Sequence, residues 1–148
     1  MHLSAFLGDE HRKCDDHFAD MDTAMHRGDW KTAGDALAAF AAATLHHFHV
    51  EEDIVFPEFE RATGRVGGPT QVMRMEHADM RELLDELQRA ILELDRAQAT
   101  GIGETLLMLL QQHNAKEERI LYPMLDRLLG PMTDELLERI ESAHQISA

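Results

Sequence analysis

The feature that most constrains this chain is an internal repeat. When the sequence is shifted so that Glu10-His11 falls on Glu76-His77, the two halves align without a gap. The segment HFHVEEDIVFP then falls on HNAKEERILYP, and Asp29 falls on Asp95. The polar residues recur, whereas most of the apolar residues between them differ. Because a repeat constrains the architecture of the whole chain, we expect each half to fold into the same unit.

Each half is expected to form two helices. In the first half, apolar residues recur at three- and four-residue steps from Phe6 to Met25, as one face of a helix requires. Gly28 is expected to end this helix, and Asp29 is a suitable N-cap for the next one. The second helix is expected to run as far as Pro57, which either ends or kinks it.

The second half repeats this plan after a glycine-rich connection at residues 64–68. Pro69 is well placed at the start of the third helix, and a fourth helix is expected from about Asp95 to the region of Pro123. Residues 131–148 read as an accessory helix with acidic residues in its first turn.

These elements predict a fold class. Short connections between long amphipathic helices favour an all-α, up-down-up-down four-helix bundle with a short C-terminal accessory helix. A length of 148 residues suits one domain. We therefore expect a single domain over residues 1–148, with the bundle at about 5–130.

Four of the 10 histidines hold equivalent positions in the two halves. In each half, one histidine precedes the capping aspartate and another follows it by the same number of residues. At 1.5 Å per helical residue, each of these histidines is about 27 Å from its turn. Antiparallel helices place residues at equal distance from their turn side by side, so we expect one layer containing His11, His47, His77 and His113.

Two carboxylates join the same layer. Glu51 follows His47 by four residues and Glu117 follows His113 by four, which places each pair on one helix face. Buried without partners, such groups would each cost several kcal/mol. A pair of cations removes that cost, because imidazole suits iron, copper, nickel or zinc and a carboxylate can bridge two ions. A polar layer with a purely structural role is the alternative.

The repeated motifs resemble those of the hemerythrin-like, or HHE cation-binding, domains. The resemblance covers about residues 5 to 130 and rests on Glu10-His11, His47-Phe48-x-x-Glu51-Glu52, Phe56-Pro57, Glu76-His77, His113-x-x-x-Glu117-Glu118 and Tyr122-Pro123. It implies a centre of two non-heme iron ions, joined by an oxo or hydroxo bridge, that meets dioxygen, nitric oxide or peroxide. The ligands that it implies are His11, His47, Glu51, His77, His113 and Glu117.

The chain departs from the oxygen-carrying members of that family in two places. Arg81 occupies the position of a second third-helix histidine. The carriers also place their fourth-helix carboxylate five residues after its histidine, which would select Glu118. The rotation of 100° per residue favours Glu117, because Glu118 is turned about 140° from His113. Fewer histidines leave metal positions open, which favours ligand exchange and redox turnover over reversible storage of dioxygen.

Other polar residues have alternative interpretations. Cys14 is either a redox or nitric-oxide-sensing thiol or an ordinary core residue. Tyr122 is half a turn from His113 and is not expected to be a direct ligand. His17 is expected either to be structural or to support a ligand from outside the layer. The other five are expected to be surface groups, with a peripheral metal site as the alternative for His46 and His49: His2, His26, His46, His49 and His144. Four glutamates are candidates to accept hydrogen bonds from the N–H groups of the ligand histidines, and simple exposure to solvent is the alternative for each: Glu10, Glu52, Glu76 and Glu118.

Charge and composition exclude several classes of function. The formal net charge of −14 argues against nucleic acid or anionic lipid as a partner. No run of about 18 apolar residues is present, so no membrane span is expected. The first residues lack the pattern of an export signal, and one cysteine suits a reducing compartment, so we expect a cytoplasmic protein.

Two classes of function remain. In the first, the protein binds or senses dioxygen or nitric oxide, or handles iron. In the second, a di-iron centre performs redox catalysis on peroxide or nitric oxide. A helical partner-binding protein with vestigial ligands is a third interpretation. The sequence identifies no protein partner.

Overall fold

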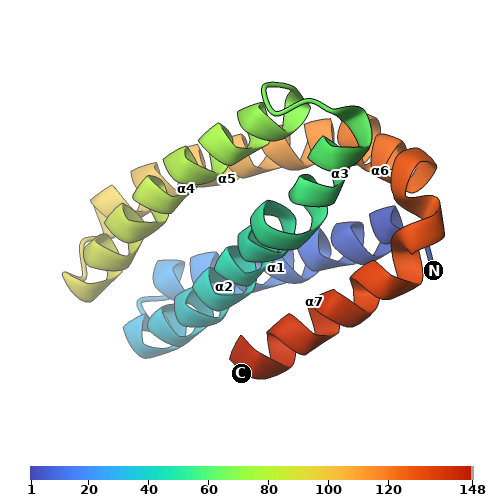
Figure 1. The fold of residues 1–148 in the computed structure, drawn as a ribbon. Helices are drawn as coiled ribbons and strands as arrows, with labels where there is room; N and C mark the ends of the chain where they lie inside the picture. The colour runs from blue at the N-terminus through green and yellow to red at the C-terminus, as the bar shows by residue number, and fades with distance from the viewer. Residues whose placement is uncertain (148) are drawn as a thin grey trace.

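The two halves of the chain form two helical hairpins that pack against each other (Figure 1). The computed structural model describes residues 1–147, with side chains through His144, and contains no strand in that range. The long helices are α1 (Leu3–His26), α2 (Trp30–Val50), α4 (Pro69–Leu92) and α5 (Arg96–Lys116). Helix α1 packs along α2 and α4 along α5, while α2 also contacts α4 and α1 contacts α5. This all-helical arrangement is compatible with the expected bundle.

The turns of the two hairpins confirm the predicted caps. The Asp29 side chain accepts a hydrogen bond from the backbone N–H of Thr32, and Asp95 does the same for Gln98. Gly28 has a φ of +76°, in the left-handed region that glycine adopts at little cost. Its counterpart in the second hairpin is Leu94, which adopts a φ of +56°. The two turns therefore share a conformation although only one of them contains glycine.

The second helix of each hairpin was expected to end or kink at its proline, and the structure shows a change of helix type there. Each continues through a π-helical turn into a short α-helix: η1 (Glu51–Val55) and α3 (Phe56–Thr63), then η2 (Glu117–Leu121) and α6 (Tyr122–Leu129). The N–H of Phe56 bonds to the carbonyl of Glu51, five residues back, as in a π-helix. Pro57 then falls in the first turn of α3, where its missing N–H is not needed. In the second hairpin, Pro123 likewise falls in the first turn of α6, directly after the π-helical turn η2.

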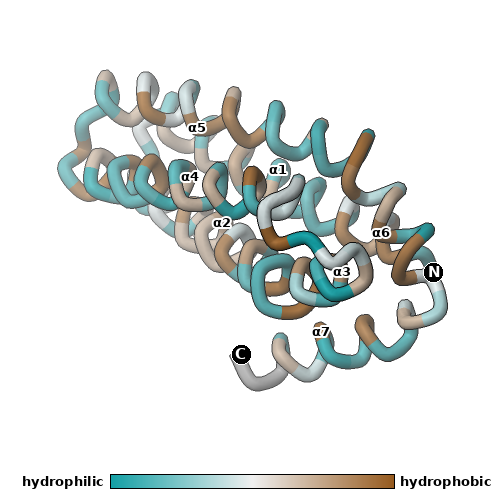
Figure 2. The backbone as a smooth tube through the Cα atoms, turned by 45° about the horizontal axis from the view of Figure 1, so that its top comes forward, coloured by the Kyte–Doolittle hydropathy of each residue, from teal (hydrophilic) through white to brown (hydrophobic). Residues whose placement is uncertain are grey.

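Two apolar clusters occupy the core. One lies toward the hairpin turns and includes Phe18, Phe40, Leu87 and Leu106. The other lies toward the chain start, where α7 (Thr133–Ser147), after the 3₁₀ turn η3 (Gly130–Met132), buries Leu136 and Ile140. Hydropathy alternates along the helices, as amphipathic packing requires (Figure 2). The predicted polar layer falls between the two clusters.

Candidate metal centre

The structure brings all six predicted site residues together in one buried layer. Each long helix contributes one histidine, and the first residue of each π-helical turn contributes one glutamate. None is more than 4% exposed: His11, His47, Glu51, His77, His113 and Glu117. Within this layer, two groups are close enough to hold a metal ion: Glu51, His77, His113 and Glu117 form one, and His11, His47 and Glu117 form the other.

The six side chains form a closed ring of short contacts. The Nε2 atoms of His11 and His47 are 3.0 Å apart, and those of His77 and His113 are 3.1 Å apart. Oε1 of Glu51 lies 3.4 Å from His47 Nε2 and 3.1 Å from His77 Nε2. Each hairpin thus supplies a histidine pair, and Glu51 connects one pair to the other.

Glu117 makes the second connection between the pairs. Its Oε1 lies 3.1 Å from His11 Nε2 and 3.2 Å from His113 Nε2. Glu118, the alternative that the oxygen carriers suggested, has a side chain 45% exposed and lies on the outer side of His11. The geometry therefore favours Glu117 over Glu118 as the inward-facing carboxylate, as the helical rotation predicted.

Each histidine of the ring has a carboxylate on its outer nitrogen, which confirms the acceptor role predicted for four glutamates. The Nδ1 atoms of His47 and His113 lie 2.7 and 2.8 Å from Glu10 and Glu76. The same atoms of His77 and His11 lie 2.6 and 3.1 Å from their partners, Glu52 and Glu118. An ionised carboxylate can only accept, so every Nδ1 donates its hydrogen outward.

This orientation determines what the inner nitrogens can do. A neutral imidazole carries one hydrogen, and here Nδ1 carries it. When both histidines of a pair are neutral, each Nε2 turns a lone pair toward the centre, and the two lone pairs face each other across about 3 Å. Lone pairs at that distance repel unless a positive charge lies between them. The arrangement suits metal ligation, in which Nδ1 is held by a carboxylate and Nε2 binds the ion.

The buried glutamates indicate the same preference for a cation. Among the described residues, Oε1 of Glu51 and Oε2 of Glu117 have no hydrogen-bond partner although both are buried. Unpartnered buried oxygen atoms of this kind are costly in a protein core. A bound cation would supply the missing partner, so the donor set fits a pair of metal ions.

The pKa values of the histidines and glutamates in the layer are shifted by burial and by one another's charges. Burial lowers the pKa of His47, but the carboxylates of Glu51 and Glu10 outweigh burial and hold it well above its ordinary value. Burial likewise lowers the pKa of His113, and Glu117 reverses the effect. For Glu51, burial raises the pKa, while attraction to His47 brings it well below the usual range. The layer attracts positive charge, whether a proton or a metal ion supplies it.

The sequence analysis expected Tyr122 not to be a direct ligand and missed its role as a hydrogen-bonding residue of the site. Its hydroxyl donates to Oε2 of Glu51 at 2.7 Å and lies 3.0 Å from Oε1 of Glu117. It also lies 3.0 Å from His11 Nε2, and the side chain is 1% exposed. Burial, together with the negative charges of Glu51 and Glu117, raises the pKa of Tyr122 well above its ordinary value, so the hydroxyl keeps its proton.

The π-helical turn explains why Tyr122 was missed. In an α-helix, Tyr122 would be turned about 140° from Glu117, five residues earlier. Within η2, residues five apart are joined by hydrogen bonds and lie nearly above one another. The repeated proline that follows Phe56 and Tyr122 is the sequence signal that could have indicated a change of helix type.

The remaining predicted residues lie outside the ring. Cys14 is buried, and burial raises the pKa of its thiol. His49 is half exposed and pairs with Asp53. Arg81, at the position of the carriers' additional histidine, binds Glu52 through both guanidinium nitrogens at 3.0 Å. It thereby holds the acceptor of His77 without entering the layer.

Comparison with known proteins identifies the family. The model of the hemerythrin HHE cation-binding domain matches residues 2–125. The chain belongs to this family. Neither the curated proteins nor the solved structures compared with it gave a match. Among the described residues of this hemerythrin-like protein, no helix combines the length and apolarity needed to cross a membrane.

Proposed function

We propose that this hemerythrin-like protein holds two iron ions in the buried layer. The ligands would be His11, His47, Glu51, His77, His113 and Glu117, with one ion near each histidine pair and the glutamates between them. The observation that carries the proposal is the pairing of inward Nε2 atoms at 3.0 and 3.1 Å, each fixed by a carboxylate on Nδ1. When bound, two iron ions supply reversible electron transfer and open coordination positions for small molecules.

The function that this site supports best is binding or sensing of dioxygen or nitric oxide, or the handling of iron. The layer is buried between two apolar clusters, so only a small ligand fits among its side chains. Tyr122 places a protonated hydroxyl beside the His11–His47 pair and so offers a hydrogen bond to a polar ligand on that side. The corresponding residue near His77 is Phe56, which offers none.

A second candidate function is a redox enzyme acting on peroxide or nitric oxide. The specific observation in its favour is again the Tyr122 hydroxyl, because reduction of either substrate consumes protons. Tyr122 keeps its proton in the metal-free site and donates it in hydrogen bonds to Glu51 and Glu117. In this candidate, the hydroxyl and its two carboxylate partners form a hydrogen-bonded path along which protons reach the centre.

Rapid mixing separates the two candidates. The reduced, iron-loaded protein would be mixed with dioxygen, peroxide and nitric oxide while its absorption spectrum is followed. A stable adduct formed once per centre supports binding or sensing. Consumption of many equivalents of peroxide or nitric oxide supports the enzyme. A spectrum that responds to none of the three contradicts both.

The cellular setting and the extent of the domain are part of the same proposal. One cysteine, which is buried and reduced, suits a reducing compartment such as the cytoplasm. The α7 helix buries Leu136 and Ile140 in the same apolar cluster as Leu7, which supports a single domain that includes the accessory helix.

A further inference from the structure

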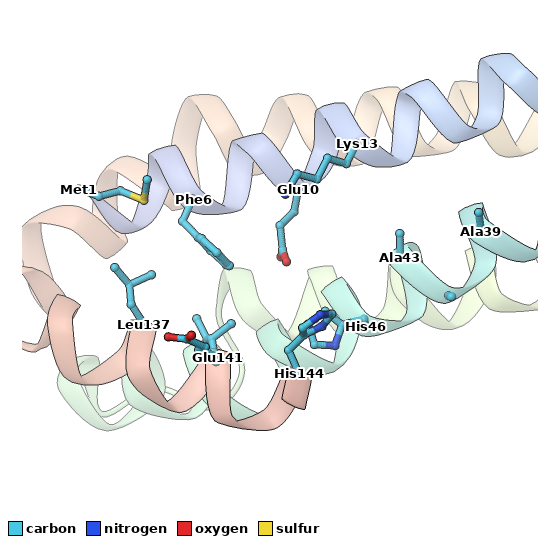
Figure 3. A pocket seen from close by; sticks show the side chains of 12 residues that line it. Met1, Phe6, Glu10, Lys13, Ala39, Ala43, His46, Leu137, Glu141 and His144 are labelled. Carbon is cyan, nitrogen blue, oxygen red and sulfur yellow. The ribbon is translucent and has the colours of Figure 1, made fainter. Parts of the chain in front are cut away.

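A cavity of about 710 Å³ lies between α1, α2 and α7, outside the metal layer (Figure 3). Small-molecule sites in proteins typically occupy roughly 300–1,000 Å³. The proposed metal function does not use this space.

Small side chains on α2 open the cavity. Its walls are mainly apolar, with Phe6 on α1, Leu137 and Ile140 on α7, and Ala43 on α2. The residue equivalent to Ala43 in the second hairpin is Leu109, and the cavity beside it measures only about 120 Å³. The α7 helix contacts α2 and η1 of the first hairpin. The cavity therefore belongs to one copy of the repeat and not to the scaffold that the two copies share.

One end of the cavity is polar, and Glu10 provides an acceptor there. Oε1 of Glu10 accepts from His47 Nδ1 at 2.7 Å, and no other described residue hydrogen-bonds to this carboxylate. In the second hairpin, Lys116 binds the other oxygen of Glu76. The residue equivalent to Lys116 is Val50, so no described side chain takes the place of that lysine at Oε2 of Glu10. Figure 3 shows the Glu10 carboxylate reaching from α1 into the space bordered by α2 and α7.

Aromatic rings surround the same end. The rings of His46 and His144 meet edge to face, with centroids 4.9 Å apart, and join α2 to α7. Phe6 extends from α1 toward α7 (Figure 3). A flat ligand placed beside these rings would meet ring faces and edges, which favour aromatic partners.

We propose that this cavity binds a small aromatic molecule that carries a hydroxyl group, that is, a phenol. The ring packs against the alanines of α2 and the apolar residues of α7, and the hydroxyl donates to Oε2 of Glu10. The described lining carries two carboxylates, Glu10 and Glu141, against one ammonium group, Lys13, so an anion is disfavoured. A neutral hydroxyl satisfies the oxygen of Glu10 without a charge penalty. The walls of the site and its acceptor are present in the protein without a bound metal.

A fluorescence titration of the purified full-length protein with 2-naphthol tests the proposal. The expected result is saturable binding with one site per chain. Naphthalene, which lacks the hydroxyl, should bind about tenfold more weakly or worse, because a hydrogen bond to a charged acceptor is lost. Failure of 2-naphthol to saturate overturns the site, and equal binding of naphthalene overturns the role of Glu10.

Two matched variants localise the binding. Ala43→Leu gives the first hairpin the residue of the second and should weaken 2-naphthol binding about tenfold or more by filling the cavity. Ala38→Leu adds the same side chain at an exposed position of α2 outside the cavity and should leave binding unchanged. Circular dichroism establishes that both variants are folded. A folded Ala43→Leu protein that binds 2-naphthol like the parent contradicts the proposal.

Discussion

The two hairpins present the same inward-facing groups in different surroundings. Each contributes two histidines and one glutamate, with a carboxylate on the outer nitrogen of every histidine. In the second hairpin, His77 is stacked by Phe48 at 3.9 Å and by Phe56 at 6.1 Å between ring centroids. In the first, the Tyr122 hydroxyl lies 3.0 Å from His11 Nε2. One histidine pair is set among rings, and the other has a polar neighbour.

The difference recurs at four buried positions related by the repeat. Cys14, Thr44, Asn114 and Tyr122 are all buried, and the residues equivalent to them by the repeat are the buried Met80, Leu110, Phe48 and Phe56. The histidines and glutamates that face the centre are the same in both copies, as binding of a cation by each copy would require. The residues at these four positions differ between the copies. A duplicated scaffold can thus hold two like donor sets and still make them chemically unequal.

The largest expected effect is loss of metal on removal of a histidine from either copy. His47→Ala and His113→Ala should each lose most of the bound metal, because each leaves an ion with too few donors beside a buried charge. Metal analysis of the purified variants measures this. His46→Ala is the matched control on the same helix and should retain the metal. Equal metal content in all three variants would contradict the ligand assignment.

The next effect concerns the outer carboxylates. Glu10→Ala and Glu76→Ala should each weaken metal binding about 10–100-fold, because the Nδ1 hydrogen loses its acceptor and the imidazole loses its orientation. Competition with a chelator measures the affinity. Glu82→Ala, an exposed position on α4, serves as the control. A large loss for only one of the two variants would show that the copies depend unequally on this contact.

Removal of the Tyr122 hydroxyl should have a smaller effect. Tyr122→Phe removes the donor to Glu51 and Glu117, which should lower the free energy of unfolding of the metal-free protein by about 1–3 kcal/mol. Thr44→Val should cost less than about 1 kcal/mol, because the partner of the Thr44 hydroxyl is the thiol of Cys14, which forms only weak hydrogen bonds. Urea unfolding measures both. A neutral Tyr122→Phe variant would imply that Glu51 and Glu117 do not depend on this donor.

The smallest expected changes in the free energy of unfolding are those of substitutions at the two hairpin turns, and the two changes should have opposite signs. Gly28→Ala should lower the free energy of unfolding by about 1 kcal/mol, because a side chain would be forced to a φ of +76°. Leu94→Gly relieves the same strain at +56° and should raise stability by less than about 1 kcal/mol, since glycine also adds entropy to the unfolded chain. Urea unfolding of the two variants checks the signs, and a destabilised Leu94→Gly protein would contradict this account of the turn.

The sequence predicted the parts of the site that lie on regular helix. His11, His47, His77 and His113 stand on uninterrupted α-helices, where equal distances from a turn translate directly into one layer. Glu51 and Glu117 follow by one α-helical turn and were also placed correctly in that layer. The caps at Asp29 and Asp95 depend on contacts within a few residues, so local sequence was sufficient.

The features that the sequence analysis missed depend on changes of helix type or on distant contacts. Tyr122 enters the site because η2 rotates the chain differently from an α-helix, and no periodicity rule for α-helices anticipates that rotation. The cavity depends on where α7 packs, which its own amphipathic pattern does not specify. His46 was expected to be a surface residue, yet it contacts His144 because α7 returns along α2.

The most direct test of the central claim is anomalous diffraction at the iron absorption edge from crystals of the iron-loaded protein. The account predicts two strong peaks per chain, one beside the Nε2 atoms of His11 and His47 and the other beside those of His77 and His113, with Glu51 and Glu117 in contact with both. A map with no peak among these six side chains, or with iron bound only elsewhere on the protein, would contradict it.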